Sequence, residues 1–106
     1  MKDATVERIR KFSEDRDWDQ FHSPANLAKS ISIEANELLE CFQWDGKNYD
    51  LQSVKEELAD VFIYCIQMSQ VLGVDMIEIS HEKMAQNAAK YPIEKAKSKA
   101  TKYNKF

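Results

Sequence analysis

The sequence "EELADVFIYCIQM", residues 56 to 68, joins three acids to a long apolar run. Glu57 and Asp60 come directly before the apolar residues Val61 to Ile66. A helical segment that is apolar nearly all round is typical of the buried centre of a fold. We therefore expect a central helix from about Leu51 to Leu72, with its apolar run covered by other helices.

Local signals on either side of this helix predict three further helices. Ser23 followed by Pro24 is typical of a helix start, because serine caps the first turn and proline tolerates the first helical position. Gly73 suits the left-handed conformation that ends helices. We expect helices over residues 3 to about 17, Pro24 to about Trp44 and Leu51 to Leu72, and a fourth that is capped by Asp75 and ends near Lys90, ahead of Pro92.

The composition supports a single all-α domain that spans residues 1–106. The chain is 43% hydrophobic and 31% charged, which is typical of a globular protein, and its two glycines and two prolines leave few breakers for a many-turned β fold. Four helices with short connections predict a four-helix bundle-like architecture. Residues 93–106 form a lysine-rich tail of undecided structure.

The distribution of charged and apolar residues argues against nucleic acid and membranes as partners. The tail holds five lysines and one glutamate, so the rest of the chain is clearly acidic, which argues against general binding to nucleic acid. The sequence has no apolar run of about 18 residues, and its first residues lack the apolar core of a signal peptide. We therefore expect a cytoplasmic protein that does not bind membranes.

Two acidic pairs are the strongest candidates for chemistry. Glu34 and Glu37 lie three positions apart, as do Glu57 and Asp60, so each pair shares one face of its predicted helix. Burying two carboxylates without a positive partner costs several kcal/mol each, on the order measured for unpaired buried charges. Hard cations such as Mg²⁺ prefer carboxylate oxygens, and two facing pairs would hold one or two of them.

Other interpretations of these acids remain open at this point. A structural charge network or a solvated helix face also places acids at helical spacing. Di-iron carboxylate bundles use two Glu-x-x-His motifs, and "EISH", Glu78 to His81, supplies one of them. The acidic pairs contain no histidine, which favours a site made only of oxygen ligands.

The order of the motifs carries a family resemblance. An ExxE pair, nineteen further residues and an ExxD pair, with "FQW" soon after the first pair, resemble the MazG-like nucleotide pyrophosphohydrolases of the all-α NTP pyrophosphatase superfamily. "RDWDQFHSPANLA" and "KMAQNAAKYP", which flank the pairs, are similar to motifs of the branch that includes dCTP pyrophosphatases. Together these motifs cover most of residues 16 to 92.

The resemblance implies an activity and an assembly. It implies Mg²⁺-dependent hydrolysis of nucleoside triphosphates to monophosphate and pyrophosphate, in house-cleaning of the nucleotide pool, by a helical protein that forms homodimers or homotetramers. Mn²⁺ is a possible substitute for Mg²⁺, and deoxypyrimidine substrates resembling dCTP are slightly favoured. The metal-binding acids of the family match Glu34, Glu37, Glu57 and Asp60, and we expect Glu34 or Glu37 to be the catalytic base toward water.

Six further residues are candidates for substrate contacts: His22, Trp44, Tyr64, Lys83, Asn87 and Lys90. The last three share one helix face, where the resemblance suggests lysines on phosphates and an asparagine on the base or sugar; without it, a solvated polar stripe is the better interpretation. The two aromatic residues offer flat faces for a base, although core positions would suit them equally. His22 matches a position near the base in dCTP-cleaving relatives.

The apolar central helix also predicts self-association. Three short neighbours give a helix of this kind little cover, so we expect burial against a second copy. Two other function classes stay open: a helical interaction or antitoxin-like module without turnover, and a di-iron carboxylate bundle.

Overall fold

The computed structural model describes residues 4–97, and every regular element among them is a helix. The elements are α1 (Ala4–Asp15), the 3-10 turn η1 (Asp19–Phe21), α2 (Pro24–Glu40), α3 (Leu51–Leu72), α4 (Met76–Lys90) and the short α5 (Ile93–Ala96). The all-α class predicted from the sequence is confirmed. The chain divides into two compact units, one up to Val74 and one from Asp75, and each is described by itself. The single-domain interpretation stays a prediction, and most of the lysine-rich tail lies outside the described residues.

Helix α3 has the bounds predicted from its sequence, and both of its ends have a clear cause. Ser53 Oγ donates a hydrogen bond of 2.6 Å to the Asp50 carboxylate in the first turn. Gly73, with φ of 69°, adopts the left-handed conformation at the other end. The Val74 N–H then donates to the Ser69 carbonyl at 2.9 Å, which closes the helix in a Schellman motif.

Helix α2 starts as predicted but ends earlier. The Asn26 N–H donates to Ser23 Oγ at 3.1 Å, and Pro24 takes the first helical position. The expected end near Trp44 is wrong, because α2 ends at Glu40. From Cys41 onward the backbone N–H groups bond to carbonyls three residues back, which tightens the chain into turns before the loop.

Helix α1 ends in a second Schellman motif, with Asp17 in the left-handed conformation at φ of 54°. The Trp18 N–H donates to the Ser13 carbonyl and the Asp17 N–H to the Glu14 carbonyl, both at 3.0 Å. This geometry turns the Trp18 ring back onto Phe12, with ring centroids 5.7 Å apart. The tryptophan is therefore fixed against the last turns of α1.

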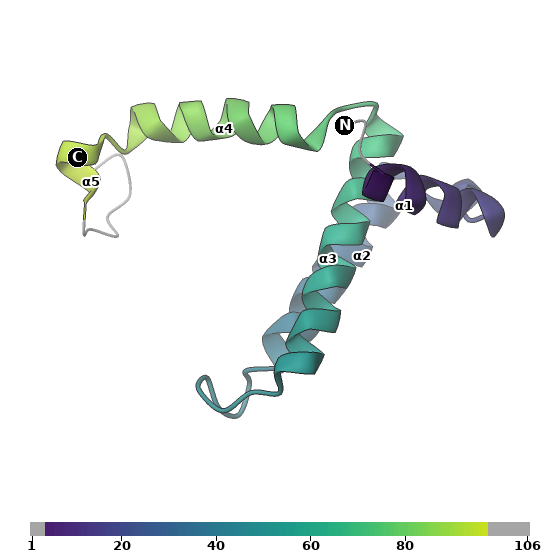
Figure 1. Cartoon of the computed structure of the whole chain (residues 1–106), viewed down its shortest axis with the longest axis horizontal. Helices are drawn as coiled ribbons and strands as arrows, with labels where there is room; N and C mark the ends of the chain where they lie inside the picture. The colour runs from purple at the N-terminus through teal and green to yellow at the C-terminus, as the bar shows by residue number, and fades with distance from the viewer. Residues whose placement is uncertain (1–3, 98–106) are drawn as a thin grey trace. The chain divides into compact units, whose positions relative to one another are not determined.

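Helices α1 and α2 both pack against α3 in the first unit. Figure 1 shows α2 running alongside α3, and Leu27 of α2 and Ile66 of α3 are its most completely buried side chains. Two side-chain hydrogen bonds join α1 to α3. Gln67 Nε2 donates to Ser13 Oγ at 2.9 Å, and Gln70 Nε2 donates to the Val6 carbonyl at 3.0 Å.

The expectation of a buried apolar run in α3 is met only in part. Ile66 is buried. Phe62 in the run is 51% exposed, and Leu51 and Leu58 ahead of the run are 61% and 55% exposed. These three lie at i, i+7 and i+11, hence on one face of α3. Among the described residues of the first unit, only α1 and α2 make extensive contacts with α3, and they leave these three side chains exposed.

No single helix among residues 4–97 has the length and apolar content of a membrane span. Helices α3 and α4 pass that test only when taken together, as a pair interrupted between Leu72 and Met76.

Candidate active site

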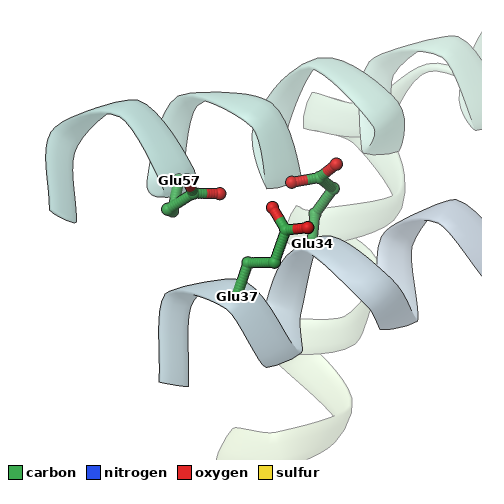
Figure 2. A group of neighbouring side chains, drawn as sticks. All are labelled: Glu34, Glu37 and Glu57. Carbon is green, nitrogen blue, oxygen red and sulfur yellow. The ribbon is translucent and has the colours of Figure 1, made fainter. Parts of the chain in front are cut away.

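Three carboxylates meet between α2 and α3. Glu34 and Glu37 extend from α2 and Glu57 extends from α3, as Figure 2 shows. One oxygen of each lies within 4.8 Å of an oxygen of the other two. The helical spacing of Glu34 and Glu37 places both on the face of α2 that packs on α3. The structure therefore brings together three of the four acids predicted from the sequence; we call them the carboxylate cluster.

Like charges and burial make this cluster unfavourable by itself. Burial raises the pKa of Glu34 to about 7, and a hydrogen bond with Glu37 and repulsion from Glu37, Asp60 and Glu57 act in the same direction. Burial also raises the pKa of Glu57, reinforced by a hydrogen bond and repulsion from Glu37. Carboxylates that share a site disfavour one another's ionised form, and a bound cation would remove that cost.

Unpaired oxygens in the cluster fit a bound cation. Oε2 of Glu34 and Oε2 of Glu57 are buried and have no hydrogen-bond partner. Among residues 4–97, no lysine or arginine forms an ion pair with either side chain. An unsatisfied buried acceptor costs about 1–3 kcal/mol, and more when it is charged. The cluster therefore has the donor set that Mg²⁺ or Mn²⁺ prefers, together with free oxygens to bind it.

The alternative interpretations of the acids fit this geometry less well. A structural charge network needs a basic side chain among the carboxylates, and the described residues supply none there. The cluster contains no histidine, and Glu78 and His81, the Glu-x-x-His motif, are exposed on α4 in the second unit. The donors present favour a hard divalent cation over a di-iron centre.

Asp60, the fourth predicted acid, lies one turn beyond Glu57 on α3. It is exposed and stands outside the group of atoms within 4.8 Å. Its charge nevertheless contributes to the raised pKa values of both Glu34 and Glu57, so it lies near enough to act on them. Asp60 also lines a cavity, so this cavity reaches the acidic end of α3.

That cavity, of about 550 Å³, lies in the first unit between α1, the residues around η1 and α3. Its wall is mainly apolar and aromatic, with Phe12 and Trp18 on one side and Phe62 and Tyr64 on the other. Ligand pockets of this size and character, with a few polar groups in an apolar wall, are typical binding sites for small molecules. We call this space the α1–α3 cavity.

The predicted substrate contacts divide into two groups. Tyr64 and His22 line the α1–α3 cavity together with Asp60. Trp44 is 89% exposed in the connection after α2 and is not among the residues that line the cavity. Lys83, Asn87 and Lys90 are exposed on α4, which belongs to the second unit, so their contribution to the site remains a prediction.

Trp18 and Gln67 are among the residues of the cavity wall that the sequence alone does not identify. Trp18 had no periodicity argument, because its position depends on the Schellman motif that follows α1. Gln67 lines the cavity and is only 5% exposed. The signal for it was a polar residue at the end of the apolar run "VFIYCIQM".

Comparisons with known proteins agree with this geometry. A model of the MazG-like family matches residues 29–106. The chain is 35% identical over 117 residues to dCTP pyrophosphatase 1 of Homo sapiens, covering 98% of this chain and 69% of that protein. It is 33% identical over 114 residues to dCTP pyrophosphatase 1 of Mus musculus, covering 95% of this chain and 67% of that protein.

A solved structure shows the same fold. The crystal structure of a pyrophosphatase from Archaeoglobus fulgidus matches with a TM-score of 0.74 and 38% sequence identity, over 83% of this chain and 89% of that one. The resemblance found in the motifs is therefore confirmed, and the chain belongs to the MazG-like family.

Proposed function

We propose that this chain is a Mg²⁺-dependent pyrophosphohydrolase that converts nucleoside triphosphates, deoxynucleotides above all, to monophosphates and pyrophosphate. The observation that carries the proposal is the carboxylate cluster with its unpaired oxygens, close to a cavity of about 550 Å³ with aromatic walls. Family membership, and relatives named as dCTP pyrophosphatase and pyrophosphatase, support hydrolysis of a phosphoanhydride bond.

The carboxylates account for the chemistry that this reaction needs. Negative oxygens around the α-phosphate repel an attacking hydroxide. A divalent cation, when bound, neutralises such oxygens and lowers the pKa of water. Glu34, Glu37, Glu57 and Asp60 are the residues proposed to hold it, with Mn²⁺ as a substitute for Mg²⁺.

Glu34 or Glu37 is the proposed general base toward the attacking water. Because burial and its neighbours raise the pKa of Glu34, its carboxylate accepts a proton more readily than an ordinary glutamate does.

The α1–α3 cavity is the proposed site of the base. Tyr64 and Trp18 offer aromatic faces for stacking, and His22 adds a polar group at the same wall. The names of the relatives support deoxypyrimidine substrates resembling dCTP.

Residues outside this cavity would complete the substrate site. Lys83 and Lys90 of α4 are proposed to bind phosphates and Asn87 to bond the base or sugar. Trp44 is proposed as a further stacking residue.

A homodimer or homotetramer is the proposed assembly. Leu51, Leu58 and Phe62 leave one face of α3 uncovered within the first unit. Large apolar side chains exposed on one helix face favour association with another chain. Burial against a second copy would also supply the four-helix packing that the sequence predicts. The proposed setting is the cytoplasm, in house-cleaning of the nucleotide pool, with no nucleic acid or membrane partner.

A non-catalytic helical interaction module, antitoxin-like in character, is the second candidate. Such a module has no need for three acids that meet between two helices, so the carboxylate cluster argues against it. The di-iron carboxylate bundle is the third candidate, and elemental analysis of the purified protein separates it, because it predicts bound iron.

The experiment that tests the proposed function is incubation of the purified chain with a panel of canonical and modified dNTPs, with products resolved by chromatography. We expect monophosphate and pyrophosphate with Mg²⁺, loss of both products with EDTA, and recovery on addition of excess Mg²⁺ or Mn²⁺. Absence of cleavage across the panel with either metal would favour the interaction module.

A further inference from the structure

Gln67 is a buried polar side chain in the wall of the α1–α3 cavity. It lies on α3 and is only 5% exposed. Its Nε2 donates a hydrogen bond of 2.9 Å to Oγ of Ser13 on α1, whose residue is 2% exposed. Its Oε1 is buried and has no hydrogen-bond partner.

The contact between α1 and α3 satisfies only one of the two polar atoms of the Gln67 amide. The bond to Ser13 engages the nitrogen and thereby orients the group, which leaves the oxygen as a fixed acceptor. Buried acceptors in native proteins nearly always have a partner, so an exception beside a cavity indicates a missing donor. A donor carried by a ligand in the cavity would satisfy Oε1.

The position of Gln67 along α3 fits the outer edge of a nucleobase. Asp60, Tyr64 and Gln67 all line the cavity and follow one another at i, i+4 and i+7 on one face of the helix. Seven residues of helix rise about 10 Å, which is the scale of a nucleotide from its phosphates to the far edge of its base. With phosphates near Asp60, the base edge reaches the level of Gln67.

We propose that Gln67 Oε1 accepts a hydrogen bond from the exocyclic amino group of a cytosine base and so selects cytosine over uracil and thymine. Cytosine presents an amino donor where uracil and thymine present a carbonyl oxygen, which would face Oε1 as acceptor against acceptor. Sites built around one hydrogen bond discriminate strongly against analogues that lack it. This assignment rests on the proposed function, because it places a nucleotide in the cavity.

The first test compares kcat/KM for dCTP and dUTP in the wild type and two variants. Gln67→Met keeps the length of the side chain and removes both polar atoms. Gln70→Met is the matched control, since it removes the other bond between α3 and α1, to the Val6 carbonyl, but leaves Gln67 and its bond to Ser13 in place. We expect Gln67→Met to lower the dCTP/dUTP ratio about tenfold, mainly through dCTP, and Gln70→Met to keep the ratio within about threefold. Equal changes of the ratio in both variants would assign Gln67 a structural role only and overturn the proposal.

The second test changes the ligand and needs no turnover. Isothermal titration of the metal-free wild type compares dCMP, dUMP and a deoxycytidine monophosphate analogue with hydrogen in place of the 4-amino group. We expect dCMP to bind about tenfold more tightly than the other two. Equal, reversed or undetectable binding overturns the role of Gln67. Because this result does not depend on hydrolysis, it is separate from a failure of the proposed pyrophosphohydrolase activity, and it does not require a variant to fold.

Discussion

Glu34 of α2 and Glu57 of α3 place carboxylate oxygens within 4.8 Å of each other, and each keeps its Oε2 buried without a hydrogen-bond partner. Helices α2 and α3 therefore pack together even though their carboxylates repel one another when ionised. Elsewhere in this interface apolar side chains such as Leu27 and Ile66 are fully buried. A cation at the cluster would convert the repulsion into an attraction between the two helices.

Divalent cations should stabilise the wild-type fold. A cation that binds only the folded state raises the unfolding free energy by about 2.7 kcal/mol at one hundred times its dissociation constant. We expect Mg²⁺ or Mn²⁺ to raise the melting temperature relative to EDTA, and Glu34→Gln to lose most of that increase. Glu40→Gln, an exposed glutamate at the end of the same helix, is the control and should respond as the wild type does. An equal response of both variants to the metal would argue against the cluster as its site.

The stability of the metal-free protein should fall as pH rises from about 4.5 to about 7. The pKa of Glu34 is about 7 in the fold and 4.5 as its ordinary value, so the folded state holds more protons within this window. Raising the pH removes those protons and destabilises the fold. Urea unfolding in EDTA at pH 5 and pH 7.5 measures the effect, which should shrink in Glu34→Gln. A midpoint that rises over this range would contradict it.

Carboxylates whose pKa is lowered in the fold do not affect this pH dependence between about 4.5 and 7. Hydrogen bonds from the Lys47 and Asn48 N–H groups and the Asn48 side chain lower the pKa of Asp45 below 3.8. A group with a lowered pKa loses its stabilising contribution only as pH falls through that lower range. Its titration lies below the window in which Glu34 acts.

Asp60→Asn should abolish turnover and leave the helices intact. The substitution keeps the shape of the side chain but removes the charge that acts on Glu34 and Glu57. We expect kcat to fall at least about a hundredfold, with an unchanged far-ultraviolet circular dichroism spectrum. Near-native rates for this variant would show that the fourth acid of the proposed site is wrongly assigned.

Light scattering should give a dimer or a larger assembly at micromolar concentration. Leu58→Lys places a charge at the centre of the uncovered face of α3, and we expect it to shift the distribution toward monomer. Glu56→Lys, an exposed position on the same helix, is the control and should leave the mass unchanged. A stable wild-type monomer would refute the proposed assembly.

Helix limits were predictable where a single residue sets them. Gly73 in the left-handed conformation, Asp75 accepting from two N–H groups and Ser23 with Pro24 are local signals, and the structure confirms each of them. The end of α2 was not predictable, because Phe42 and Trp44 continue the apolar pattern after the backbone has left the α-helical conformation.

The candidate site, like the helix limits, is only partly predictable from the sequence. Spacing along each helix predicts that Glu34 and Glu37 share a face, but only the packing of α2 on α3 selects Glu57 as their neighbour and leaves Asp60 outside the group. The α1–α3 cavity depends on contacts between segments far apart in the sequence. For that reason the sequence alone predicts no role for Gln67, whose side chain bonds to Ser13 of a distant segment.

Hydrolysis of dCTP by the wild type and by two variants of adjacent residues tests the central claim most directly. Glu57 belongs to the carboxylate cluster, whereas Glu56 is exposed and accepts a hydrogen bond from Gln52. With Mg²⁺, the wild type and Glu56→Gln should both yield dCMP and pyrophosphate, and Glu57→Gln should be at least about a hundredfold slower. Release of dCDP and phosphate, or equal rates for the two variants, would contradict the account.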